Sequence, residues 1–87
     1  MHQEAQLRSE IRQFVQNDLL MGDASAMLGD DESLLETGTI DSTGVLEVVM
    51  FLEQTFGMKV HDREMLPENL DSVDRLVQFV LRKQHAA

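Results

Sequence analysis

The chain has 87 residues, 43% of them apolar, and its 16 acidic and 7 basic side chains give a net charge of −9. This length predicts a single domain over residues 1–87, and the charge argues against nucleic acid or anionic membranes as partners. The absence of cysteine excludes disulfides, thiolate metal sites and a cysteine nucleophile. The longest apolar run, Val48 to Leu52, is far shorter than a membrane span of about 20 residues, so we expect a soluble, cytoplasmic protein without membrane insertion.

The first elements expected along the chain are a helix and a long loop. Between residues 3 and 20, apolar side chains recur with the spacing of one helical stripe. They are Leu7, Ile11, Phe14, Val15 and Leu19. Residues 21–41 lose this period and collect glycines and acidic residues, which predicts a long loop. We expect Leu34, Leu35 and Ile40 to pin this loop to the core.

A second helix is predicted from Ser42 to Phe56, because the helical period resumes there and Gly57 is the residue expected just beyond a helix end. The stripe that should enter the core consists of Val45, Val48, Val49, Leu52 and Phe56. Phe51 lies opposite the centre of the core, and we expect the long loop to pack on it.

Residues 59–71 contain the only proline and predict at most one short helical turn, at Pro67. A last amphipathic helix follows from Ser72, with Arg82 and Lys83 in its final turn, where cations suit the helix dipole. Strand signals are negligible. We therefore expect an all-α, four-helix bundle with a long loop between the first two helices and a short third helix.

Ser42 stands at the start of the second predicted helix, directly after Asp41. One interpretation is structural: serine is a favoured N-cap whose hydroxyl satisfies an orphan backbone amide. The capping box that would support it is missing, since Val45 stands where Glu or Gln is required. The other interpretation is chemical, because free amides and the positive end of the helix dipole favour a phosphate at such a hydroxyl.

A second arc of this helix combines apolar and acidic side chains. Leu46 and Met50 lie one turn apart on it, with Glu47 and Glu53 around them. A small apolar patch with an acidic rim is typical of surfaces that dock basic proteins. Two simpler alternatives stay open: Leu46 and Met50 widen the buried stripe, and the acidic residues only keep a small protein soluble.

The stretch Leu35-Glu36-Thr37-Gly38-Thr39-Ile40-Asp41-Ser42-Thr43-Gly44-Val45-Leu46-Glu47 resembles the 4′-phosphopantetheine attachment site of acyl carrier proteins and peptidyl carrier domains. The hallmark of that family is Asp-Ser at the start of the second helix, and the resemblance covers nearly the whole chain. It implies that Ser42 carries the prosthetic arm, which comes from coenzyme A, and that Asp41 matches the aspartate before it. It also implies that partner enzymes contact Thr43, Leu46, Glu47, Met50 and Glu53.

By this resemblance the chain is a carrier and not an enzyme: it holds an acyl or aminoacyl group as a thioester on the arm and presents it to other enzymes. Most carriers place Leu or Met after the serine, whereas Thr43-Gly44 follows here. The form of the motif looks closer to stand-alone carriers of amino acids, such as D-alanyl carrier proteins, so we favour a small amino acid as cargo. A fatty-acyl or polyketide carrier is the alternative, and an acidic interaction module without cofactor is the alternative from another class.

The partners that the resemblance implies are a phosphopantetheinyl transferase and an adenylate-forming acyl or aminoacyl ligase with a basic docking surface. A monomer is expected for a mobile shuttle. Metal or hydrolytic chemistry has little support in the sequence. His2, His61 and His85 are scattered without ligand spacing, and no base partners Ser42.

Overall fold

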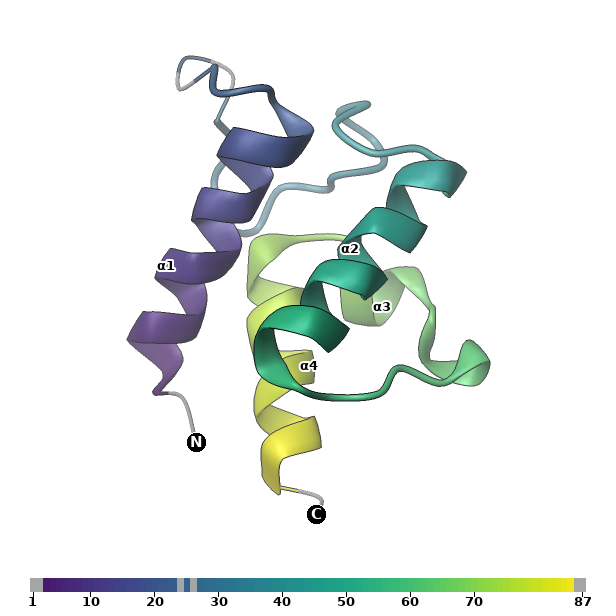
Figure 1. Cartoon of the computed structure of the whole chain (residues 1–87). Helices are drawn as coiled ribbons and strands as arrows, with labels where there is room; N and C mark the ends of the chain where they lie inside the picture. The colour runs from purple at the N-terminus through teal and green to yellow at the C-terminus, as the bar shows by residue number, and fades with distance from the viewer. Residues whose placement is uncertain (1–2, 24, 26, 86–87) are drawn as a thin grey trace.

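The computed structural model describes residues 3–23, 25 and 27–85, and within that part the protein is all-helical, without strands (Figure 1). The elements in chain order are α1 (Glu4–Phe14), the π-helical segment η1 (Val15–Leu19), α2 (Ser42–Phe56), the 3₁₀ turn η3 (Asp62–Glu64), α3 (Pro67–Leu70) and α4 (Val73–His85). The predicted fold class, with its long first loop and short third helix, is confirmed.

One apolar core joins these elements. α1 packs along α4, and α3 packs on α4, as Figure 1 shows. The predicted stripe of α2 faces this core: Val48, Val49 and Leu52 are buried, while Val45 and Phe56 are partly buried against it. The helix also begins and ends where the sequence predicts, and Gly57 adopts the left-handed conformation with φ 64°.

The first helix changes pitch near its end. The sequence predicts one helix to residue 20, but α1 ends at Phe14 and a π-helical turn follows, in which the Leu20 N–H donates to the Val15 carbonyl over 2.9 Å. Apolar periodicity does not reveal this change, because Val15 and Leu19 keep the same four-residue spacing.

Asp71 holds the long loop against the bundle. Its backbone carbonyl accepts from the Leu34 N–H over 2.8 Å, and its carboxylate accepts from the Leu35 N–H over 2.8 Å and the Ser33 hydroxyl over 2.6 Å. Leu34 and Ile40 are buried, as predicted. The prediction for Leu35 is wrong: its side chain is exposed, because the loop is fixed there through its backbone and not its side chain.

Charged side chains tie the same loop to α1 and α4. Asp30 accepts hydrogen bonds from Arg8 and Arg12, and Arg8 also reaches Asp74. The hydrogen bonds that Arg8 donates to Asp74 and Asp30 raise the pKa of Arg8. Burial alone would raise the pKa of Asp30, but the hydrogen bonds and charges of the two arginines lower it below its usual value.

Three local expectations are corrected. Phe51 packs on Phe14 of α1, with ring centroids 4.1 Å apart, and not under the long loop. The segment before α4 holds two short turns, η3 and α3, where at most one was predicted. α4 begins at Val73, because Ser72 acts as its cap and accepts from the Arg75 N–H over 3.1 Å.

Candidate functional site at the start of α2

Asp41, and not Ser42, caps α2. Asp41 has extended backbone geometry, and its carboxylate accepts from the Gly44 N–H over 2.7 Å. Its backbone carbonyl accepts the first helical hydrogen bond, from the Val45 N–H over 3.1 Å. The interpretation of Ser42 as the N-cap is therefore wrong, and its hydroxyl is not needed to start the helix.

Ser42 occupies the first helical position with its side chain exposed. Within the described part of the chain, neither its hydroxyl nor its backbone N–H has a hydrogen-bond partner, and the same is true of the Thr43 N–H. Two free amides at the positive end of a 15-residue helix surround an accessible hydroxyl. This arrangement fits a phosphate group bonded to the Ser42 oxygen.

Gly44 lets the preceding loop close onto the first turn of α2. A Cβ at this position would stand 3.1 Å from the Ile40 Cβ and 3.5 Å from the carboxylate of Asp41. Ile40 is buried, so its side chain has little freedom to retreat. The glycine therefore keeps the cap and the buried Ile40 close together, even though it lowers helix propensity.

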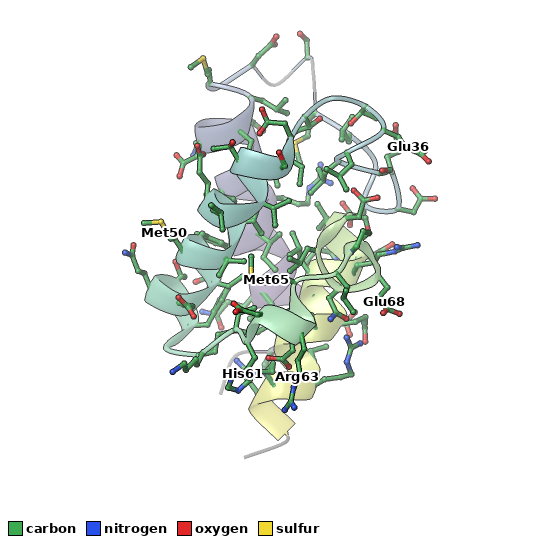
Figure 2. The ribbon with its side chains drawn as sticks, turned by 90° about the vertical axis from the view of Figure 1, so that its right-hand side faces the viewer. Glu36, Met50, His61, Arg63, Met65 and Glu68 are labelled. Carbon is green, nitrogen blue, oxygen red and sulfur yellow. The ribbon has the colours of Figure 1, made fainter. Side chains whose placement is uncertain are left out.

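The outer face of α2 carries most of the predicted partner residues. Leu46 and Met50 are 53% and 56% exposed, so the alternative in which they widen the buried stripe is wrong. Figure 2 shows Met50 projecting outward from α2. Met65, by contrast, is partly buried against the core. Thr43 and Glu47 are also exposed.

Glu53 differs from the other residues of that face. It is half-buried, and its carboxylate accepts from the Val60 N–H over 3.0 Å. This bond fixes the chain where it leaves the C-terminal end of α2. Sequence spacing puts Glu53 beside Met50 but gives no sign of this internal role.

A small apolar cavity of about 220 Å³ opens beside Ser42. The loop, α2 and the α3 region all contribute to its wall, which includes Ile40, Val45, Leu66 and Leu70. Because these residues are distant in the sequence, periodicity within one helix gives no indication of the cavity. Its wall suits a short apolar group better than a charged one.

Metal binding finds no support in the described residues, which contain no group of three or more potential metal ligands. His2 lies outside the described residues, and only the backbone of His85 is described. Asp30, the first of the three consecutive acidic residues 30–32 in the loop, accepts hydrogen bonds from two arginines. No helix in the described ranges is long and apolar enough to cross a membrane.

A helical bundle that presents an exposed serine at an amide-rich helix start has the architecture of a carrier protein. A family model described as the phosphopantetheine attachment site matches residues 7–80. The chain belongs to this family, whose members carry 4′-phosphopantetheine.

The chain is similar to the D-alanyl carrier proteins of Streptococcus pyogenes serotype M1 and of serotype M5 (strain Manfredo). Each is 40% identical over 68 residues, which are 78% of this chain and 84% of the relative. A chain in the crystal structure of an FAD-dependent dehydrogenase is 30% identical and superposes with a TM-score of 0.69. That match covers 80% of this chain and 97% of the other.

Proposed function

We propose that Ser42 is the attachment residue and that the protein is a stand-alone carrier of a small amino acid. The observation that carries the proposal is the free hydroxyl of Ser42 at a turn whose cap is already provided by Asp41. When bound, 4′-phosphopantetheine supplies a thiol that holds the cargo as a thioester. The chain itself is then a substrate of other enzymes and not a catalyst.

The chemistry at Ser42 requires an accessible nucleophile and a place for negative charge. In the attachment step the Ser42 oxygen forms a bond to the phosphorus that carries the pantetheine, the P–O bond from that phosphorus to the rest of the diphosphate breaks, adenosine 3′,5′-bisphosphate leaves, and the hydroxyl proton passes to a base of the transferase. The free N–H groups of Ser42 and Thr43 would be available to donate to the new phosphodiester. Asp41 holds the turn in place through the Gly44 N–H.

The test is incubation of the protein with coenzyme A and a phosphopantetheinyl transferase, followed by intact mass measurement. We expect the wild type and the control variant Ser9→Ala, which changes an exposed serine of α1, to gain one arm and Ser42→Ala to gain none. Addition of the arm to Ser42→Ala would overturn the assignment. Circular dichroism establishes that each variant is folded.

The cargo is proposed from the similarity to D-alanyl carrier proteins and from the surroundings of Ser42. Thr43 is exposed and offers little apolar contact beside the attachment point. The neighbouring cavity is apolar and would accept an acyl chain more readily than an ammonium group, so an amino acid would stay in water beside it. The similarity and Thr43 therefore support the choice of D-alanine or another small amino acid over a long acyl chain.

A panel of adenylate-forming ligases with D-alanine, other small amino acids and fatty acids tests the cargo, with the mass of the loaded protein as readout. We expect ATP-dependent loading of a small amino acid onto the holo protein. Loading of long fatty acids with no amino acid accepted would overturn the cargo while leaving Ser42 as the attachment residue.

Because coenzyme A and ATP are abundant in the cytoplasm, we propose that the protein works there.

The ligase should present Lys or Arg toward Glu47, which is exposed and has no ion pair within the described residues. We expect Glu47→Lys to slow loading, and to slow it more at low salt than at high salt, because screening weakens repulsion between like charges. Asp31→Lys, an exposed loop variant with the same change of charge, is the control. Equal effects of both variants would show that only net charge matters.

The similarity to a chain in the structure of an FAD-dependent dehydrogenase favours a second candidate function, in which the loaded protein is the substrate of a flavin dehydrogenase. In such a step the tethered group loses two electrons and two protons as a new double bond forms, and FAD becomes FADH₂. The loaded protein would then lose the mass of two hydrogen atoms when a flavin dehydrogenase is added. An unchanged mass with a dehydrogenase active on other carriers would remove this candidate.

A further inference from the structure

An open groove of about 590 Å³ lies between the end of the first helix and α2. The stacked rings of Phe14 and Phe51 line it, together with the exposed side chains of Met21 and Met50. One wall comes from η1 and the residues that follow it, and the other from α2. We call this feature the Met21–Met50 groove.

Met21 is held in a strained and exposed position at the rim of this groove. Its φ is 55°, its side chain is 91% exposed, and the helix end around it closes through the Gly22 N–H, which donates to the Gln16 carbonyl over 2.7 Å. Glycine is the usual residue at such a position, because a side chain is disfavoured in the left-handed region. Packing does not offset this cost, since the side chain contacts little of the bundle.

Strained residues and π-helical turns both concentrate at functional sites, and here they occur together. Methionine is also the apolar residue best suited to partner surfaces, because its side chain is flexible and polarisable. The methionine on the facing wall, Met50, is 56% exposed. Two exposed methionines therefore face one groove from two elements.

The charge of the groove is negative. Asp18 and Glu47 line it from opposite walls, and neither carboxylate has an ion pair or hydrogen bond within the described residues. Among the residues that the structure describes, no basic side chain lines the groove. The same two carboxylates line a neighbouring cleft of about 300 Å³ that reaches Thr43 and Gly44, so this acidic surface continues to the first turn of α2.

We propose, on the basis of the function proposed above, that the Met21–Met50 groove docks the ligase that loads the cargo. The ligase would insert a large apolar side chain between the two methionines and present Lys or Arg to Asp18 and Glu47. The recognition surface thus extends from α2 across to the end of the first helix.

The distance of Met50 from Ser42 along α2 favours a ligase over a transferase as the enzyme that docks in this groove. Met50 lies eight residues beyond Ser42, or about 12 Å along the helix axis. A transferase must bring coenzyme A to the Ser42 hydroxyl itself, so it has to cover the first turn. A ligase acts at the far end of the arm and therefore has room to bind farther along the helix.

The direct test is NMR of the holo protein labelled with ¹³C at its methionine methyl groups, titrated with the ligase that loads it in the panel above. We expect the Met21 and Met50 signals to shift or broaden together. Met27 and Met58, which are partly buried and lie outside the groove, serve as internal references. A change at Met50 without one at Met21 would overturn the proposal.

Kinetics provide the second measurement. We expect Met21→Gln to raise the KM of the ligase for the holo protein about fivefold and to leave kcat unchanged, because an exposed anchor contributes to docking and not to chemistry. Asp18→Asn should raise KM about twofold at low salt, while Asp31→Asn, the matched loop control, should not change it.

Met21→Gln should accept the arm from the transferase at the wild-type rate, because Met21 lines the groove and not the cleft that reaches the first turn of α2. If the wild-type protein never accepts the arm, the proposed function is contradicted. A Met21→Gln variant that accepts the arm normally and is loaded with the wild-type KM would contradict only the groove.

Discussion

The long loop at residues 21–41 and the outer face of α2 are both rich in acidic residues, but they use their carboxylates differently. In the loop, Asp30 forms ion pairs with Arg8 and Arg12, so its charge is balanced within the molecule. On α2, Glu47 is exposed and unpaired among the described residues. The count of 16 acidic side chains therefore overstates how many carboxylates are available to a partner, and only the three-dimensional pairing shows which acids remain free.

The largest difference between the two regions is expected in stability, when one leucine in each is replaced by alanine. Leu34 of the loop is fully buried, so Leu34→Ala should lower the free energy of unfolding by about 3 kcal/mol through lost burial and a cavity. Leu46→Ala on α2 should change it by no more than about 0.5 kcal/mol, because that side chain is 53% exposed. Urea unfolding followed by circular dichroism measures both, and similar losses would contradict the division between the regions.

The second variant removes the carboxylate that anchors the loop. Asp71→Ala deletes the acceptor for the Ser33 hydroxyl and the Leu35 N–H, so we expect a loss of about 2 kcal/mol in the free energy of unfolding. Asp31→Ala, an exposed acid in the same loop, is the control and should change stability by less than about 0.5 kcal/mol. If the two variants unfold at the same urea concentration, Asp71 does not hold the loop.

The third comparison separates capping from chemistry at neighbouring residues. Asp41→Ala should cost about 1 kcal/mol, because the Gly44 N–H loses its cap. Ser42→Ala should change stability by less than about 0.5 kcal/mol, since the hydroxyl is exposed and unbonded within the described part. Thermal unfolding of the apo protein measures both, and a larger loss at Ser42 would restore the N-cap interpretation.

The smallest expected effect is a pH dependence. The pKa of Asp30 is lowered in the folded state, so its ionised form contributes stability that is present above the usual carboxylate range, near pH 4, and is lost as the pH falls below it. The contribution should be less than about 1 kcal/mol, because the ion pairs are partly exposed. Asp30→Asn should flatten the stability profile in this window, whereas a profile identical to wild type would contradict the pairing.

The sequence predicts those parts of the fold that depend on local pattern. The period of α2, its end at Gly57 and the long loop are all visible as apolar spacing and glycine position. The motif at Asp41 and Ser42 is likewise local, and its resemblance to carrier proteins identifies the family before the fold is known.

The features that the sequence does not predict all join distant segments. The bonds from Asp71 to the loop, the Phe14–Phe51 stack and the Met21–Met50 groove each bring together residues from different elements. The π-helical turn that ends at Leu19 keeps the apolar spacing of an ordinary helix, so periodicity gives no sign of it. Glu53 shows the same limit, since its bond to the Val60 N–H depends on how the chain turns after α2.

The proposal that Ser42 carries the 4′-phosphopantetheine arm is tested most directly by intact mass and peptide mapping of the protein purified from its own host. We expect one arm per chain, located on the peptide that contains Ser42, with any additional mass corresponding to a small aminoacyl group. An arm located on Ser33 or Ser72, or a chain that carries no arm in cells with an active transferase, would contradict it.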